Sequence, residues 1–408
     1  MYVVSAAWPS GWLGVYYVIG KSGYIMETGE TYIADIEKIV HGGVGLARFR
    51  GHTVLVRFVL GGEKVRIRIT GKSQGVWWGE VVDLLETSVH RRSPACPLYG
   101  RCGGCDLQHI DYERQLEIKR QVVTENLART ARLNVELPRA EASRPYGYRN
   151  RVVLHRKPQG ELGFHERRSK RVIPVDHCPV AAEGINRFLQ RARRTKPQEV
   201  EAKKRVTVFG DDHRYLVAGQ NRSVKWDVKG RSVWLHLNAF FQSNLRMLDA
   251  LVEEVCRGES GESCVDLYGG IGLYSAFLVD RFDAVTLVEN NKAAVKAAAK
   301  NVPQAYCRCQ DVDNWVRKEG ASRTYDTVVA NPPRKGLSTA VREYLNRSKT
   351  ARIVYISCEP STLARDLEEL TQLGSYALEG VRLFDMYPQT AHVETVAKLV
   401  ATKEKISV

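Results

Sequence analysis

Two residues near the C-terminal end of the chain have the types and surroundings that covalent catalysis needs. Cys358, in Ser357-Cys-Glu-Pro360, follows the apolar run 353–356, which predicts a buried strand. A cysteine at the carboxyl end of such a strand lies where α/β enzymes keep their reactive groups. Glu394 ends Thr390-Ala-His-Val-Glu394 further along the chain. An isolated cysteine is more often a small buried hydrophobe, so the functional interpretation depends on neighbouring motifs.

An enzyme with a thiol as nucleophile and a carboxylate as base could catalyse the methylation of a pyrimidine. Carbon 5 of the ring is a poor nucleophile, and addition of a thiolate to carbon 6 makes it enolate-like. After methyl transfer, a base must remove the proton on carbon 5 so that the thiolate can leave. Cys358 would be the nucleophile and Glu394 the base. His392 lies two positions from Glu394 and would share a strand face with it; we expect His392 to be structural.

A glycine-rich loop upstream predicts a nucleotide-type cofactor. Asp266-Leu-Tyr-Gly-Gly-Ile-Gly272 follows one predicted strand and precedes a helix expected near Leu273, so the backbone can approach a ligand closely. Glu289 ends the next strand, where a carboxylate can accept hydrogen bonds from ribose hydroxyls. NAD shares both features, but the order Gly-x-Gly-x-x-Gly is absent, which favours S-adenosylmethionine.

Asn331-Pro-Pro-Arg334 ends a third apolar strand. Its prolines fix a rigid turn that could hold a planar substrate against the cofactor. The alternative is an ordinary strand-ending loop, because prolines interrupt strands in any case. Arg334 in the fourth position suits an RNA phosphate better than a stacked base.

The elements that must position these residues divide the chain into four regions. We expect an extension over residues 1–27 that is poorly ordered, with Met26 as an alternative start. Short strands over 28–88 predict a small OB-like barrel. Residues 89–235 predict a mixed α+β central domain, with a helix over 112–132. Strand–helix alternation over 236–408 predicts an α/β fold with a doubly wound parallel sheet, a Rossmann-like catalytic domain.

The predicted barrel has a basic row. Lys64, Arg66 and Arg68 alternate with Val and Ile, so they would line one face of a strand and could meet RNA. An edge strand protected by charge would show the same pattern.

Composition favours a polyanionic partner. The 408 residues carry a formal net charge of +15, and clusters of Lys and Arg fall mostly between residues 90 and 205, which is typical of nucleic-acid binding. Nine unevenly spaced cysteines favour a reducing compartment, here the cytoplasm, over a secreted disulfide scaffold. No stretch is apolar enough for a transmembrane helix, and the first residues lack the features of a signal peptide.

Four cysteines form a compact pattern. Cys96, Cys102 and Cys105, the last two in Cys-Gly-Gly-Cys, are joined by Cys178 in Asp176-His-Cys-Pro179. Four thiolates suit either zinc or an iron–sulfur cluster, and spacing does not separate the two. The other cysteines outside the catalytic motif are expected to be packing residues.

Several ordered motifs resemble the RNA 5-methyluridine methyltransferase family: Asp266-Leu-Tyr-Gly-Gly, Phe240-Phe-Gln-Ser-Asn244, Ser357-Cys-Glu-Pro-Ser-Thr-Leu-Ala-Arg-Asp366 and Asp385 to Glu394. The resemblance covers nearly the whole chain from residue 28. It implies Cys358 as nucleophile, Glu394 as base, a [4Fe–4S] cluster on the four cysteines, and a barrel of the RNA-binding TRAM type. The cofactor contacts that it implies are Gln242, Tyr268, Glu289, Asp311 and Asn331.

Within that family, the cysteine pattern and barrel resemble the 23S ribosomal RNA enzymes, with transfer RNA as the alternative substrate. We expect a monomer without an obligate protein partner. A cytosine-5 methyltransferase would want a second cysteine in a Pro-Cys motif, which is absent. A catalytically silent RNA-binding protein is disfavoured because both Cys358 and Glu394 are present.

Three positions depart from the family pattern. Gly269 stands where cysteine is usual, Asn331 where aspartate is usual, and Glu359 where asparagine is usual. The first change should be harmless, and the second removes a charge but keeps a hydrogen-bonding oxygen. Glu359 should raise the pKa of the neighbouring Cys358 thiol through like-charge repulsion.

Overall fold

The computed structural model describes residues 26–49, 51–195, 203–219, 223–372 and 375–402. The predicted N-terminal extension therefore lies outside the described residues, apart from its last two positions. Contacts divide the chain into two units. The first comprises residues up to 38 and 45–87; the second comprises residues 39–44 and 88–408. The boundary predicted near residue 235 falls inside the second unit and stays a prediction.

The N-terminal strands form a closed barrel in the order β1-β2-β3-β5-β4. Antiparallel pairing of β1 with β4 closes it, and β3 runs parallel to β5. Alternate residues of β4, including Val65, Ile67 and Ile69, point into its core. The strands are β1 (Thr31–Val40), β2 (Val44–Phe49), β3 (His52–Arg57), β4 (Lys64–Ser73) and β5 (Val76–Glu86).

The predicted basic row lies on the outer face of β4, but its charges are paired. Arg66 meets Asp83 at 2.7 Å, Lys64 meets Glu86 at 2.9 Å, and Arg68 meets Glu80 at 3.6 Å. The carboxylates all come from β5. Since β4 pairs with both β1 and β5, the charged edge-strand alternative is wrong. The row is a ladder of exposed ion pairs, each of which adds little stability.

The second unit begins with helix α1 and a small antiparallel sheet of order β10-β9-β6-β7-β8. Helix α2 packs on this sheet through Ile185, Phe188 and Leu189. The predicted helix over 112–132 is confirmed as α1 followed by one wide turn at 127–131. The elements are α1 (Tyr112–Asn126), β6 (Arg151–Arg156), β7 (Leu162–His165), β8 (Val172–Pro174), α2 (Glu183–Arg194), β9 (Arg205–Gly210), β10 (Tyr215–Val217), and a separate hairpin of β11 (Ser223–Val228) and β12 (Arg231–His236).

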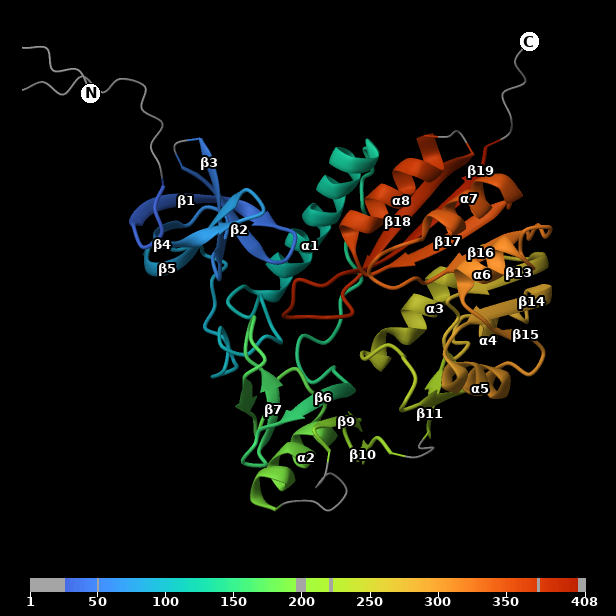
Figure 1. Cartoon of the computed structure of the whole chain (residues 1–408), viewed down its shortest axis with the longest axis horizontal. Coiled ribbons are helices and arrows are strands. Elements are labelled where there is room, and N and C mark those ends of the chain that lie inside the picture. Colours follow the sequence, from blue (N-terminus) through green and yellow to red (C-terminus); the bar gives the residue numbers. More distant parts are fainter. Residues whose placement is uncertain (1–25, 50, 196–202, 220–222, 373–374, 403–408) are drawn as a thin grey trace, which may run out of the picture. The chain divides into compact units, whose positions relative to one another are not determined.

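The C-terminal half builds a seven-stranded sheet of order β15-β14-β13-β16-β17-β19-β18, with helices on both sides (Figure 1). Its strands are β13 (Gly261–Leu267), β14 (Phe282–Glu289), β15 (Tyr306–Cys309), β16 (Thr327–Ala330), β17 (Arg352–Ser357), β18 (Tyr376–Phe384) and β19 (Glu394–Ala401). Its helices are α3 (Leu248–Cys256), α4 (Ser275–Leu278), α5 (Lys292–Asn301), α6 (Val312–Arg317), α7 (Thr339–Ser348) and α8 (Pro360–Gln372), with the 3-10 turn Leu245–Met247 before α3.

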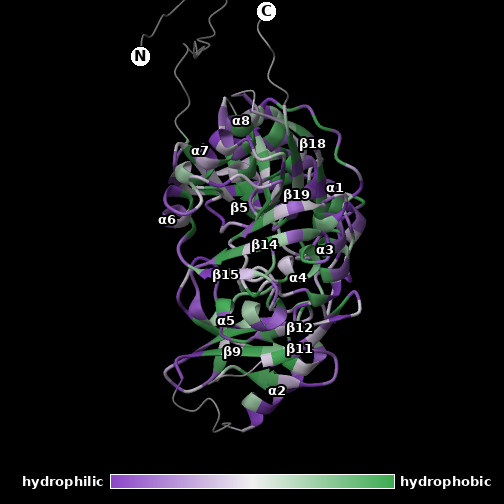
Figure 2. Cartoon of the chain, turned by 90° about the vertical axis from the view of Figure 1, so that its right-hand side faces the viewer, coloured by the Kyte–Doolittle hydropathy of each residue, from purple (hydrophilic) through white to green (hydrophobic). Residues whose placement is uncertain are grey.

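Strand β17 shows why this sheet needs helices on both faces. Ile353 and Tyr355 belong to one core cluster, while Val354 and Ile356 belong to another. Because successive side chains point to opposite faces, a continuous apolar run is buried only when both faces are covered. Figure 2 shows hydrophobic residues along the strands and hydrophilic residues on the loops around them.

The Rossmann-like fold is confirmed, with one correction to the sheet. Strands β13 to β17 are parallel, but β19 pairs antiparallel with both β17 and β18. The sheet is therefore mixed rather than wholly parallel, because the last two strands are joined by a loop and not by a crossover helix. None of the described helices combines the length and apolar character that crossing a membrane requires.

Candidate active site

Cys358 directly follows strand β17, and Glu394 is the first residue of its paired strand β19. Ser357 at the end of β17 pairs with Thr395 in β19, and the Thr395 hydroxyl donates to the Ser357 carbonyl at 2.9 Å. The next position on each strand is Cys358 and Glu394. Antiparallel register therefore places the nucleophile and base predicted from the sequence beside each other at the sheet edge.

Glu394 is a buried carboxyl group. It is only 2% exposed, and Gln242 Nε2 donates to its Oε1 at 3.4 Å. The Tyr387 hydroxyl donates in turn to Gln242 Oε1 at 3.2 Å. Burial raises the pKa of Glu394 to about 8, although the Gln242 hydrogen bond opposes the shift. A carboxyl group that titrates near neutral pH is suited to exchange a proton with a substrate.

Cys358 is half-buried, and its thiol has a raised pKa of about 11. Burial is the largest cause, followed by the Glu394 carboxylate; Arg334 lowers the pKa and Glu359 raises it. Glu359 thus acts in the direction expected from the sequence, but it is not the main cause. In the RNA-free protein the Cys358 thiol is therefore protonated at neutral pH, because burial and the nearby carboxylates disfavour the thiolate.

The raised thiol pKa predicts slow alkylation of Cys358 in the RNA-free protein. Its reaction with iodoacetamide should accelerate on the order of tenfold per pH unit from pH 7 to about 10, since only the thiolate reacts. Mass spectrometry of the Cys358 peptide measures the rate, with the exposed thiol of Cys309 as internal reference. A rate that levels off below pH 8 would contradict the assigned environment.

Arg334 lies against His392. Its Nη2 is 3.1 Å from Nε2 and 3.3 Å from Nδ1 of the imidazole. Burial, and then Arg334, lower the pKa of His392 to about 4, so the ring is neutral at physiological pH. His392 precedes β19 and is not part of it, so the expected common strand face with Glu394 is wrong. The Arg334 guanidinium is the cation that lowers the pKa of the Cys358 thiol.

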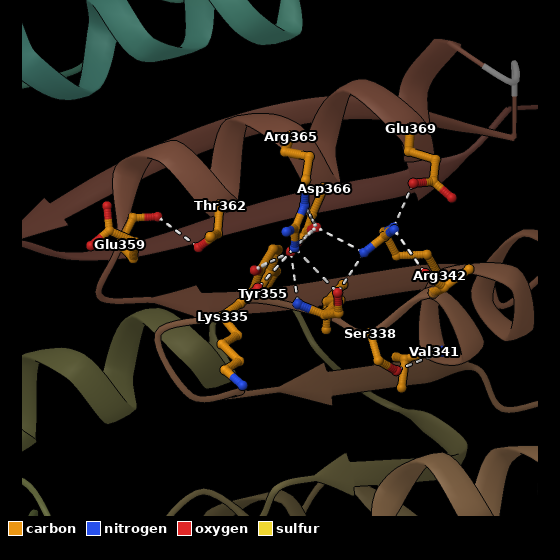
Figure 3. Close-up of polar contacts among 12 residues, drawn as sticks. Lys335, Ser338, Val341, Arg342, Tyr355, Glu359, Thr362, Arg365, Asp366 and Glu369 are labelled. Carbon is orange, nitrogen blue, oxygen red and sulfur yellow. Dashed lines mark hydrogen bonds and ion pairs between the residues drawn. The ribbon is translucent and has the colours of Figure 1, made fainter. Parts of the chain in front are cut away.

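The loop that carries Arg334 is hydrogen-bonded to helix α8, and Figure 3 shows Arg365 and Asp366 of that helix at the centre of the polar contacts beside Lys335. Thr362 Oγ1 donates to the Arg334 carbonyl at 3.2 Å, and Arg365 Nη2 donates to the Lys335 carbonyl at 2.9 Å. The Leu337 amide donates to buried Asp366 at 2.8 Å. Sequence reasoning quoted the motif that contains Arg365 and Asp366 but gave these residues no role.

Asp366 is the centre of this fastening. Its carboxylate accepts hydrogen bonds from Tyr355, Arg342 and Arg365 as well as from the loop amide. Gly336 has φ of 73°, and an added Cβ would collide with the Asp366 carboxylate. Glycine is required there on both counts. The Asp366 carboxylate is fully buried, but four donor groups, two of them guanidinium groups, compensate its charge.

Removal of the Asp366 carboxylate should strongly destabilise the fold. Asp366→Ala leaves Arg342, Arg365 and the Tyr355 hydroxyl without their shared acceptor, so the free energy of unfolding should fall by about 3–5 kcal/mol. Urea denaturation measures the loss. The matched control is Glu368→Ala on the same helix, where the carboxylate is exposed and bonded only to Gln372 in the described residues; this change should cost less than about 0.5 kcal/mol. Equal losses for the two variants would contradict this account.

The predicted cofactor contacts gather at the carboxyl ends of neighbouring strands. Tyr268 follows β13, Glu289 ends β14, Asp311 follows β15 and Asn331 follows β16. The Asn331 amide donates to the Leu267 carbonyl at 3.2 Å, which holds Asn331 beside Tyr268. This is the edge where open α/β sheets bind ligands.

The glycine loop is shaped to admit a ligand close to the backbone. Tyr268, Gly270 and Gly272 all have positive φ, and the space around an added Cβ at Gly270 is open. The Gly270 amide donates to Glu289 Oε2 at 3.1 Å, and the Asn291 amide donates to Oε1 at 2.7 Å. Glu289 therefore orders the loop, and its contact with a ribose stays a prediction. The residues fit S-adenosylmethionine, which would supply an electrophilic methyl group.

Asp311 has a structural role at the start of helix α6, apart from the cofactor contact predicted for it. Its carboxylate caps helix α6 by accepting a hydrogen bond from the Asn314 amide at 3.1 Å.

Gly269 packs closely on strand β14, because a Cβ at this position would lie 2.6 Å from Leu287 Cγ. The glycine that replaces the usual cysteine therefore leaves no empty space, because Leu287 of β14 packs directly against it.

The four cysteines line one cavity of about 850 Å³ in the second unit. Burial, with a smaller contribution from neighbouring thiols, raises the pKa of Cys105 to about 12 and of Cys178 to about 11. Within the described ranges, no three His, Cys, Asp or Glu side chains stand in the geometry of a metal site. The four thiols line the same cavity, thiolates are suitable ligands for a metal centre, and the metal assignment stays a prediction.

Comparisons with known proteins identify the family of the chain. The model of the tRNA (uracil-5-)-methyltransferase family matches residues 211–402. An uncharacterized RNA methyltransferase of Treponema denticola is 30% identical, covering 89% of this chain and 98% of that protein. The tRNA (uracil(54)-C(5))-methyltransferase of Pyrococcus horikoshii is 30% identical, covering 85% and 95%.

A solved structure extends the likeness to the fold. Pyrococcus abyssi tRNA (uracil-54, C5)-methyltransferase, in complex with S-adenosyl-L-homocysteine, superimposes with a TM-score of 0.70 at 25% identity. The match covers 90% of this chain and all of that one. The chain thus belongs to the RNA (uracil-5-)-methyltransferase family and is an S-adenosylmethionine-dependent enzyme.

Proposed function

We propose that the enzyme methylates carbon 5 of one specific uridine through a covalent adduct between Cys358 and carbon 6 of the base. The observation that carries this proposal is the pairing of β17 with β19, which makes Cys358 and Glu394 neighbours. A thiol and a base that act on adjacent ring carbons must lie side by side, and two residues at corresponding strand ends meet that need.

The proposed reaction balances as follows. The Cys358 thiol first loses its proton to water, and the resulting thiolate forms a bond to carbon 6 while the electrons of the carbon 5–carbon 6 double bond move into the ring enolate. Carbon 5 then takes the methyl group of S-adenosylmethionine, leaving S-adenosylhomocysteine. Glu394 removes the proton on carbon 5, the double bond reforms, and the carbon–sulfur bond breaks to release the thiolate.

Arg334 has a supporting part in the proposed reaction. Its guanidinium favours the thiolate form of Cys358, and the α8 fastening holds its loop in place. As a cation at the site it also suits an RNA phosphate or a ring oxygen that gains charge. Neutral His392 packs against it and is proposed to be structural.

Two sets of observations bear on which class of RNA is the substrate, and they favour different classes. The barrel and the four cysteines favour 23S ribosomal RNA. The P. horikoshii and P. abyssi proteins, matched over nearly their full lengths, carry names that give uridine 54 of transfer RNA as target. Since the P. abyssi match extends over 90% of this chain, we place transfer RNA first and 23S ribosomal RNA second.

Labelled methyl transfer distinguishes these substrates. Purified enzyme, S-adenosylmethionine carrying a labelled methyl group and separated unmodified ribosomal and transfer RNAs should give label in one class only. Nuclease digestion and mass spectrometry should find 5-methyluridine at a single position. Label in transfer RNA at one uridine supports the first candidate, and label in 23S ribosomal RNA the second. Label on cytidine, or on neither RNA, would overturn the proposal.

We further propose that Cys96, Cys102, Cys105 and Cys178 hold a [4Fe–4S] cluster with a structural role, since the methylation scheme needs no electron transfer. Anaerobically purified protein should be brown and contain about four iron and four sulfide per chain. Colourless protein with one zinc per chain would refute the cluster.

A further inference from the structure

The loop that precedes the proposed catalytic base, Glu394, is held in its conformation by residues outside the loop. Residues 385–393 connect β18 to β19, carry His392 and end directly before Glu394. The loop has no helix or strand of its own, and Gln389 adopts a φ of 67°, which is costly for a residue with a side chain. External contacts must therefore fix its conformation. We call residues 385–393 the catalytic loop.

Helix α1 supports the beginning of the catalytic loop. Buried Lys119 donates to Asp385 at 2.6 Å and to the Tyr387 carbonyl at 3.0 Å. Gln115 and Gln389 exchange two hydrogen bonds of 3.0 Å. These contacts hold positions 385–389 but do not reach Ala391 or His392.

The tip of the catalytic loop is held by the segment that bears the cysteines. The amides of Asp106 and Leu107 both donate to the Gln389 carbonyl at 2.9 Å. Asp106 Oδ2 accepts from the Ala391 amide at 3.2 Å. Asp106 directly follows Cys105, so three hydrogen bonds join the end of the cysteine segment to the catalytic loop, and one of them is made by Ala391, the residue before His392.

Arg167 fixes the orientation of Asp106 relative to Cys105. Its Nη1 donates to Asp106 Oδ1 at 2.8 Å, and its Nη2 donates to the Cys105 carbonyl at 2.5 Å. Both side chains of this ion pair are less than one-fifth exposed, so solvent competes weakly for the contacts. The carboxylate is thereby aimed at the Ala391 amide.

We propose that Asp106 is a positioning residue that couples the cysteine site to the catalytic loop. This inference rests on the proposed function, because it assigns the four cysteines a role in a reaction without electron transfer. Ligation of the four thiols would restrict residues 96–105, and the hydrogen bonds of Asp106 and Leu107 would pass that restriction to Ala391 and His392. Catalytic groups need such support, since small misplacements cost large factors in rate.

Three variants separate positioning from general structure. Asp106→Ala removes the acceptor of the Ala391 amide, whereas Asp106→Asn keeps an oxygen that can accept it. Asp211→Ala is the control: that carboxylate accepts hydrogen bonds from the backbone amides of His213 and Arg214, as Asp106 does from the Ala391 amide, but it touches no described residue of the catalytic loop.

The first readout is amide hydrogen exchange in RNA-free protein. Asp106→Ala should exchange at Ala391 and His392 on the order of tenfold faster than wild type, as loss of one hydrogen bond predicts, while Asp106→Asn stays closer to wild type. Cys105→Ser, which impairs the cysteine site, should give the same local pattern, and Cys309→Ser should not. Unchanged exchange in Asp106→Ala or Cys105→Ser, or an equal rise in Asp211→Ala, would overturn the coupling.

The second readout is single-turnover methylation. Asp106→Ala should lower the rate on the order of tenfold to a hundredfold with unchanged affinity for RNA, and Asp106→Asn should recover part of the loss. Faster exchange without a lower rate would overturn the positioning role. Hydrogen exchange needs no methyl transfer, so a wild-type protein that fails to methylate uridine would refute the proposed function while the coupling is still tested.

Discussion

Cys358→Ala should lower RNA methylation on the order of 10⁴-fold or more, which is the scale seen when a covalent nucleophile is removed. Cys358 is half-buried at the end of β17, and alanine fits in its space, so the fold should be retained. RNA affinity should change little, because phosphate contacts and not the target base dominate it.

Methyl transfer under single-turnover conditions and RNA binding by filter retention measure these two effects separately. Cys309→Ala is the matched control, since it removes an exposed thiol from the end of β15 and should leave the rate unchanged. A Cys358→Ala rate within tenfold of wild type would contradict covalent catalysis.

Glu394→Gln should stop the reaction after methyl transfer and leave the protein bound to RNA. Glutamine has the shape of glutamate and can keep the contact with Gln242, but it cannot accept the proton on carbon 5. Elimination of the thiolate then fails. The expected product is a protein–RNA band that survives denaturing electrophoresis and contains one labelled methyl group per chain.

The control for this experiment is Glu368→Gln on α8, whose carboxylate bonds to Gln372 within the described residues; this variant should turn over normally and leave no band. Repeated turnover by Glu394→Gln would move the base to another residue. In the wild-type enzyme, the pKa of about 8 for Glu394 predicts a pH dependence. The carboxylate fraction rises with pH, so the elimination rate should increase on the order of tenfold per pH unit below pH 8 and flatten above it.

The sequence was sufficient to predict the strands that position the site. Apolar runs such as 353–356 are buried on both faces, and each ends where a functional side chain begins, so local pattern and fold agree. Cys358, Tyr268, Glu289 and Asn331 are consequently found at strand ends, as expected.

The end of the sheet could not be predicted in the same way. Strand β19 enters between β17 and β18, and this order depends on pairing between distant segments rather than on local pattern. For the same reason the sequence leaves the basic row of β4 open between RNA contact and protection of an edge strand, because the β5 carboxylates that pair with the row lie in a different strand.

The contacts that hold the catalytic loop could not be predicted from the sequence either. Lys119 and Asp385 form a buried ion pair although they are 266 positions apart. Asp106 reads as an ordinary surface residue next to a cysteine, and only its contact with the Ala391 amide gives it a role. Such residues have no characteristic spacing, because their partners lie elsewhere in the chain.

The central claim is that Cys358 forms the bond to the base during methylation. RNA in which 5-fluorouridine replaces uridine tests it directly, because fluorine cannot be removed as the carbon 5 proton is, and the adduct persists. Wild-type enzyme incubated with this RNA and S-adenosylmethionine should yield, after digestion, a peptide containing Cys358 joined to a methylated fluorouridine. A methylated nucleotide joined to another residue, or methylation of normal RNA without any adduct to fluorinated RNA, would contradict the account.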